Sequence, residues 1–109
     1  MKLNPAAIEL ARELLDDGLF RISTPWGKVR PSADSAAVHR EAFGAEDTAR
    51  WYLAVDPDSG ETRLPIGDFK AVHRSGLVAA LDEARLHGWT DIAEAADDIL
   101  FLFDRLTAC

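Results

Sequence analysis

The run from residue 67 to residue 106 constrains the fold more than any other part of this chain, because it carries two amphipathic helical patterns in succession. In the first pattern, apolar residues recur at three- and four-residue spacing between Asp68, the expected N-cap, and Gly88, the expected helix stop. In the second, a similar apolar stripe follows the expected N-cap Thr90 and reaches Leu106. The link between the two patterns is short, so we predict an antiparallel helix pair that carries most of the core.

The rest of the chain alternates short helical and strand-like segments separated by turn residues. The expected elements are, in chain order, a helix from Pro5 to Gly18 with Asn4 as N-cap, strands at residues 19–23 and 28–30, helices at 32–42 and 46–55, and a strand at 61–66. Pro65 cannot donate a hydrogen bond to a neighbouring strand, which makes the last of these an expected edge strand. We therefore predict a mainly helical α+β fold, one domain over residues 1–109, with about five helices around a small two- or three-stranded antiparallel sheet.

The composition is that of a folded, acidic protein. With 109 residues, 48% of them hydrophobic and 28% charged, the chain is long enough to bury a core and too apolar to be disordered. The formal net charge is −7, from 19 acidic and 12 basic residues. Such a protein is repelled by phosphate backbones, so general nucleic-acid binding is not expected. The acidic residues either serve solubility, the simpler interpretation, or mimic a nucleic acid towards a basic partner.

The lack of targeting signals and the low cysteine content both favour a cytoplasmic location. The longest apolar run, residues 99–103, is far too short to span a bilayer, and the N-terminus lacks the apolar core of a signal peptide. The single cysteine, Cys109, excludes a disulfide framework and a cluster of thiolate metal ligands, and we expect it to be an inert terminal thiol. We therefore expect a cytoplasmic protein without membrane contact.

No combination of residues indicates catalysis or a bound cofactor. The three histidines, His39, His73 and His87, are not separated by the three or four residues that place two metal ligands on one helix face. Ser75 beside His73 is not a catalytic dyad, because neighbours in a helix point about 100° apart. We expect no enzyme activity, no cofactor and no metal.

Three basic residues, Lys70, His73 and Arg74, fall in the first turns of the helix predicted to begin after Asp68. The helix dipole disfavours positive charge there, by about 0.3–1 kcal/mol for each residue. One interpretation is that the three residues bind an acidic group of a partner or an anionic ligand, together with the free amides of the helix end. The other is that they pair with this protein's own acidic residues.

Two further features suggest contacts with other molecules. Trp26 lies in a turn between Pro25 and Gly27, and exposed Trp is enriched at binding hot spots; the alternative is that it packs on the small sheet. The last predicted helix is apolar on nearly every side, which places Leu100 or Phe101 at an interface. A homodimer is the simplest explanation for such an interface.

Several motifs follow one another in a distinctive order. They are Leu-Asn-Pro at residues 3–5, Trp-Gly at 26–27, Arg-Trp-Tyr-Leu at 50–53, Ile-Gly-Asp-Phe at 66–69, Val-His-Arg-Ser-Gly-Leu at 72–77 and Ala-Ala-Asp-Asp-Ile-Leu at 95–100. This order resembles a family of short bacterial proteins, mostly actinobacterial, for which no activity is established, and a related pattern occurs in phage-associated proteins. The resemblance covers nearly the whole chain, is most specific in the Gly-Asp-Phe…His-Arg-Ser-Gly-Leu segment, and implies a compact bacterial domain. Related sequences have a longer acidic turn where this chain has residues 56–61, so ligand contacts from that turn are not carried over.

Together these observations favour a small cytoplasmic domain that acts through protein–protein contacts as an adaptor or regulatory module. The candidate partner or anion contacts are Trp26, Lys70, His73 and Arg74, and the candidate homodimer interface is Leu100 and Phe101. Two alternatives stay open. One is an inhibitor of the phage or mobile-element type that uses an acidic surface, and the other is an anion- or small-ligand-binding protein that uses the basic helix entrance.

Overall fold

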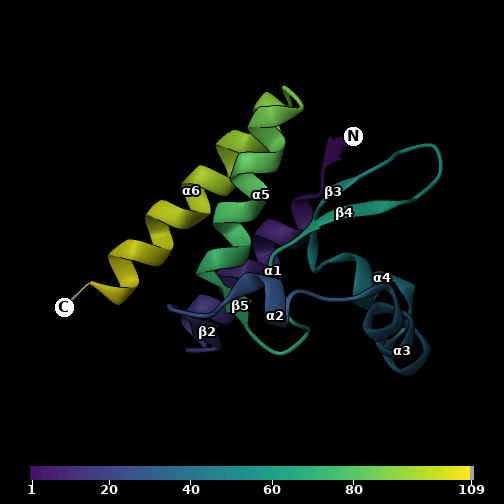
Figure 1. Ribbon diagram of the computed structural model, residues 1–109, viewed down its shortest axis with the longest axis horizontal. Coiled ribbons are helices and arrows are strands. Elements are labelled where there is room, and N and C mark those ends of the chain that lie inside the picture. The colour runs from purple at the N-terminus through teal and green to yellow at the C-terminus, as the bar shows by residue number, and fades with distance from the viewer. Residues whose placement is uncertain (109) are drawn as a thin grey trace.

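The computed structural model describes residues 1–108 and confirms the mainly helical α+β class (Figure 1). The elements are β1 Lys2–Leu3, α1 Pro5–Asp16, β2 Phe20–Arg21, α2 Trp26–Val29, α3 Ala33–Phe43, α4 Ala45–Ala49, β3 Tyr52–Val55, β4 Thr62–Pro65, β5 Val72–His73, α5 Arg74–Leu86 and α6 Thr90–Thr107. Cys109, the expected inert thiol, lies outside the described residues. Among the described residues, no helix is both long and apolar enough to cross a membrane.

The two C-terminal helices, α5 and α6, lie side by side and run antiparallel, as predicted (Figure 1). Gly88 ends α5 with a positive φ of 71°, which glycine adopts without the steric cost that a Cβ brings. α6 begins at Thr90 itself, with Trp89 in the N-cap position, one residue earlier than predicted. The buried stripe of α6 consists of Ile92, Ala95, Ala96, Ile99, Leu100 and Phe103. These side chains and their counterparts on α5 form the largest part of the core.

A three-stranded antiparallel sheet in the order β1-β3-β4 packs with α1 and the helix pair. Leu53 and Ala54 of the central strand β3 are fully buried. β4 is an edge strand, as Pro65 predicted. Asn4 stands at the N-cap of α1, but its side chain makes no capping hydrogen bond. It donates instead to the carbonyls of Ala49 and Tyr52, at 3.0 Å each, and so ties the start of α1 to the start of β3.

Two predicted elements are wrong. The helix expected over residues 46–55 stops at Ala49, and residues 52–55 form β3 because their Tyr-Leu-Ala-Val sequence pairs with strands on both sides. The strand expected over residues 28–30 belongs instead to the short helix α2 and its C-cap Arg30. Both segments are short, and over so few residues periodicity does not separate helix from strand.

A second small sheet, β2 with β5, is parallel and was not predicted. It exists because the helix expected from Asp68 begins only at Arg74. The Asp68 carboxylate accepts hydrogen bonds from the amides of Lys70 at 3.1 Å and Ala71 at 2.9 Å, which closes a tight turn rather than a helix end. Phe69 in this turn has a φ of 67°, a conformation that is strained for a bulky residue.

The strained Phe69 is held by the α3–α4 segment. Its ring stacks on His39 with centroids 4.3 Å apart and meets Trp51 edge-on at 5.8 Å. His39 Nδ1 in turn lies 2.8 Å from the hydroxyl of the buried Thr48. Ser32 caps α3 by accepting a hydrogen bond from the Ser35 amide. These contacts fix α3 and α4 on one side of the Asp68 turn.

Candidate binding groove beside Trp26

The structure brings two of the four predicted contact residues together and separates the other two. Trp26 at the start of α2 and His73 at the end of β5 are neighbours, with ring centroids 5.8 Å apart. Lys70 lies exposed in the Asp68 turn, and Arg74 is the first residue of α5. The prediction that Lys70 and His73 occupy the first turns of a helix is therefore wrong, because the tight turn and β5 precede the helix.

His73 is the polar residue around which this region is built. Its side chain is 2% exposed, so it is part of the interior and not of a contact surface. Its Nδ1 lies 2.6 Å from the hydroxyl of Thr24, which in turn lies 3.3 Å from the hydroxyl of Ser75. Thr24 precedes α2, and Ser75 follows His73 in α5, so the imidazole joins the loop before α2 to the start of α5.

Asp68 faces the other nitrogen of the same ring. Its Oδ2 lies 3.1 Å from His73 Nε2, but the angles do not meet hydrogen-bond geometry, so Nε2 is buried with only an electrostatic neighbour. Burial tends to raise the pKa of Asp68, but the Ala71 amide, the nearby His73 and the Lys70 amide outweigh burial and lower it. Asp68 is therefore held as a carboxylate. We refer to Thr24, Asp68 and His73 together as the His73 centre.

The His73 centre has the hydroxyl, imidazole and carboxylate of a nucleophilic triad, but its setting favours a positioning role. A triad needs its hydroxyl to face a space where a substrate can sit. The groove described below is not lined by Thr24, Asp68 or His73. The contacts of His73 instead fix where Trp26 lies.

Trp26 packs closely on the helix α5 because Gly76 has no side chain. A Cβ at Gly76 would lie 2.8 Å from the tip of the Trp26 ring, closer than such contacts allow, so the indole lies directly against the α5 backbone. His73 packs against the same ring. With the indole fixed in this way, the half-buried Trp26 forms one wall of an open groove.

This groove, which we call the Trp26 groove, has a volume of about 370 Å³. Its lining consists of Trp26, Arg30 and Pro31, Tyr52 of β3, the four residues Thr62–Pro65 of β4, and Ala79, Ala80 and Glu83 of α5. The side chains of consecutive strand residues point to opposite faces of a sheet. A groove that touches all four residues of β4 must therefore run along the edge of this strand and not over one face. The groove therefore runs between the free edge of the sheet and α5.

Two of the three charged residues that line the Trp26 groove, Arg30 and Arg63, are positive, although the protein as a whole is acidic. Arg30 is exposed and makes no ion pair with any residue in the range 1–108. Arg63 has only a 3.7 Å contact with Glu61, and Glu83 is the one acidic residue among those lining the groove. Burial raises the pKa of the Tyr52 hydroxyl, although Arg40 lowers it, so the hydroxyl stays protonated and can donate.

The structure gives three different outcomes for the remaining predicted contact residues, Arg74, Leu100 and Phe101. Arg74 pairs with Asp104 of α6 through two hydrogen bonds of 2.8 and 3.2 Å, which agrees with the interpretation that it pairs with the protein's own acids. Leu100 is 7% exposed and packs in the core, so its expected place at an interface is wrong. Phe101 is 66% exposed on a face of α6 that also carries Arg105, and its role in a dimer stays a prediction.

Sequence analysis singled out Trp26 but missed Thr24, Asp68, Arg30 and Arg63 as parts of one region. The Gly-Asp-Phe motif was a signal for a tight turn, since Asp and Gly favour turns, but its link to Thr24 runs through His73 and depends on the parallel pairing of β2 with β5. Arg30 and Arg63 come from segments that no sequence spacing links. Compared with family models, curated proteins and solved structures, the chain gave no significant match in any of the three. The resemblance to short bacterial proteins stays a prediction.

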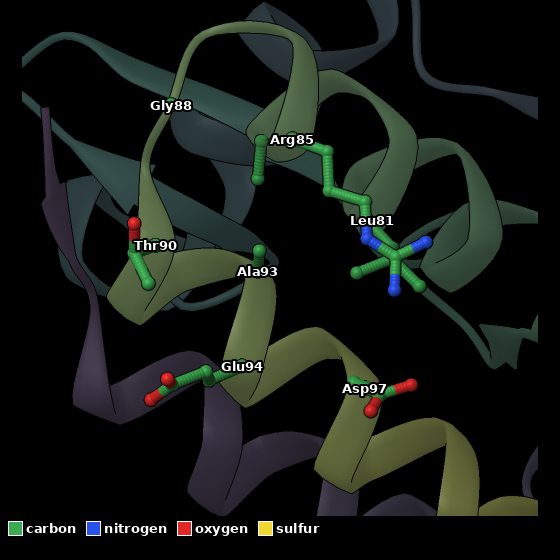
Figure 2. A pocket seen from close by; sticks show the side chains of 8 residues that line it. Leu81, Arg85, Gly88, Thr90, Ala93, Glu94 and Asp97 are labelled. Atoms are coloured by element: carbon green, nitrogen blue, oxygen red, sulfur yellow. The ribbon is translucent and has the colours of Figure 1, made fainter.

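A second pocket, of about 310 Å³, lies between the end of α5 and the start of α6 (Figure 2). Arg85 extends from α5 towards Asp97 of α6, while the Glu94 carboxylate points away from Arg85 (Figure 2). Most of its other lining residues are small, among them Ala84, Gly88 and Ala93. It offers no aromatic side chain to a ligand, and for this reason we consider the Trp26 groove the better candidate.

Proposed function

We propose that this protein is an interaction module that binds an extended, acidic segment of a partner protein in the Trp26 groove. The observation that carries the proposal is an indole fixed at the rim of a groove whose exposed charges are chiefly those of Arg30 and Arg63. Trp and Arg are the residues that most often dominate binding energy at protein interfaces. An acidic segment is complementary to this groove, whereas most of the remaining surface of a protein with net charge −7 repels it.

The edge of β4 shapes how such a segment would bind. Leu64 has a φ of 65° and Pro65 has no N–H, so two adjacent residues of the strand cannot continue a regular ladder. Strand addition to β4 is therefore disfavoured, and recognition rests on side chains. Trp26, Tyr52 and Pro31 offer flat apolar surface of the kind that binds extended or proline-rich segments.

The basic helix entrance is a weaker candidate than the Trp26 groove. Arg74 is already paired with Asp104, and His73 is buried, so only Lys70 of the three residues is free to meet a ligand. A partner that contacts Lys70 would find no second cation from this group. The Trp26 groove, and not the helix entrance, therefore supports the protein-contact function.

The proposal is tested by selecting peptides from a random display library on the wild-type protein. We expect enrichment of peptides with an aromatic, aliphatic or proline residue next to Asp or Glu. The affinity of the selected peptide is then compared for Arg30→Glu and for Lys28→Glu, which makes the same charge change in α2 outside the groove. We expect about a tenfold loss for Arg30→Glu and less than about a twofold loss for Lys28→Glu. Equal losses, or no acidic enrichment, would contradict the proposal.

A further inference from the structure

A second groove, between α1 and α6, differs from the Trp26 groove in both charge and shape. It has a volume of about 630 Å³ and shares no lining residue with the Trp26 groove. Two helical stripes form its walls. Ile8, Arg12 and Asp16 follow one another at four-residue spacing on α1, and Asp91, Glu94, Asp98 and Leu102 do so at three- and four-residue spacing on α6. We call this the α1–α6 groove.

The base of the α1–α6 groove is apolar. Ile8 and Leu102 are half-buried hydrophobic residues that pack against the core, and Ile99 beneath them is 3% exposed. The partial exposure of Ile8 and Leu102 leaves apolar surface within the groove that a further apolar side chain could cover. Burying such surface contributes about 25 cal/mol for each Å² removed from water.

The rim of the groove is strongly acidic. Asp16, Asp91, Glu94 and Asp98 line it together with a single guanidinium, that of Arg12. Within residues 1–108, none of the four carboxylates takes part in an ion pair. Figure 2 shows the Glu94 carboxylate directed away from Arg85 of α5, and Glu94 lines this groove as well as the pocket between α5 and α6. With four carboxylates and one guanidinium, the groove carries a net negative charge, which attracts positively charged groups.

We infer that the α1–α6 groove binds a basic amphipathic helix of a partner protein. Its apolar residues would lie on Ile8 and Leu102, and its Lys or Arg residues would meet the rim carboxylates. From Asp91 to Leu102 the α6 wall is about 16 Å long at 1.5 Å per residue, which matches about three turns of an occupying helix. Two neighbouring helices also leave a channel into which the ridges of a third helix pack.

Charge decides against the other occupants of this groove. A second copy of the chain carries a net charge of −7 and would meet the four carboxylates with overall repulsion, which suppresses such pairing. Nucleic acid is repelled for the same reason. This inference does not depend on the proposed function, because the two grooves have no residue in common and opposite charge.

The probe is a synthetic peptide with Leu at helical spacing on one face and Lys on its flanks, compared with a scrambled peptide of the same composition. Titration of the ¹⁵N-labelled protein locates binding through amide shifts. We expect shifts confined to the α1 and α6 stripes and an affinity for the patterned peptide at least about fivefold above that of the scrambled one. Equal affinities would show general attraction of a polycation and would overturn the inference, as would shifts centred elsewhere.

A pair of double variants provides the matched control. Asp16→Lys with Asp98→Lys reverses two groove charges, and Asp17→Lys with Asp97→Lys reverses their exposed neighbours, which do not line the groove. Both variants have the same net charge. We expect about a tenfold loss of patterned-peptide affinity for the first pair and less than about a threefold loss for the second. Equal losses in the two variants, both shown to be folded by circular dichroism, would overturn the inference.

Discussion

The α5–α6 pair and the His73 centre are held together by different kinds of contact. The helix pair is held by a long stripe of apolar side chains, many of them fully buried. Each of these side chains packs against several neighbours. The His73 centre rests on a few polar atoms from three segments, with Thr24, Asp68 and His73 each contributing one group. In the first region stability is spread over many apolar contacts, whereas in the second the arrangement depends on a few polar atoms.

This difference has a counterpart in how the two grooves are built. The α1–α6 groove lies between two long helices whose stripes are fixed by helical geometry. The Trp26 groove is assembled from a short helix, a sheet edge and the middle of α5, and its indole is placed by His73 and Gly76. Changes at the His73 centre should therefore alter binding in the Trp26 groove more than binding in the α1–α6 groove.

The largest effect is expected in the core beneath the helix pair. Phe103 is fully buried and meets Phe20 edge-on at 5.3 Å, so Phe103→Ala leaves a cavity and removes an aromatic contact. We expect the free energy of unfolding to fall by about 3–5 kcal/mol, measured by urea denaturation. Phe101→Ala, on the exposed face of the same helix, is the control and should change stability by less than about 0.5 kcal/mol.

Two glycines, Gly67 in the Asp68 turn and Gly76 in α5, allow two close approaches to be compared directly. A Cβ at Gly67 would collide with the backbone carbonyl of Ala71 and with the Trp51 ring, neither of which can give way easily. We expect Gly67→Ala to cost about 1–3 kcal/mol of unfolding free energy. A Cβ at Gly76 meets only the tip of Trp26, so Gly76→Ala should cost less stability but weaken peptide binding in the Trp26 groove. The reverse order of stabilities would contradict this account of the two contacts.

A smaller effect is expected for the ion pair that joins the ends of the helix pair. Arg74 and Asp104 form two hydrogen bonds, but their side chains are 40% and 52% exposed, so water and salt weaken the interaction. We expect Arg74→Ala to lower the free energy of unfolding by no more than about 1 kcal/mol, with the difference shrinking in high salt. A loss several times larger would show that Arg74 acts as a core residue.

The smallest effect is a change in pH dependence at the His73 centre. The pKa of Asp68 is lowered below its ordinary value of 3.8, so its contribution to stability is present above that value and is lost as pH falls through the lowered pKa. Asp68→Asn removes this contribution. Denaturation curves recorded at a series of acidic pH values should therefore show a shallower loss of stability for the variant below pH 4. Parallel curves would show that Asp68 titrates alike in the folded and unfolded states.

The parts of the fold that could be predicted are those in which a pattern acts locally. The helices α1, α3, α5 and α6 could be predicted because apolar spacing and end signals lie within one segment, and Gly88 ends α5 where expected, although the expected N-caps of α5 and α6 are displaced. The central strand β3 was taken for a helix because its character comes from the strands on either side of it. Asp68 is a sound helix cap by residue type, and the pairing of Val72 with Phe20 shows that the helix has not begun at residue 72.

The candidate sites show the same limit. Trp26 could be singled out because Pro25 and Gly27 mark a turn, but its neighbours Arg30 and Arg63 meet only in three dimensions. The acidic residues of α6 are visible in the sequence. Their relation to Asp16 and Ile8 required the packing of α1 against α6.

The parallel pairing of Phe20 with Val72 also bears on the order in which the molecule assembles. Contacts between distant segments form only after the entropy of closing the intervening chain has been overcome, whereas the helix pair has neighbours close in sequence. The helix pair can therefore nucleate folding, and the Trp26 groove is completed late, when β2 and β5 meet. Under mild destabilisation the same groove should open first. A segment bound in the groove would therefore stabilise the part of the protein that forms last.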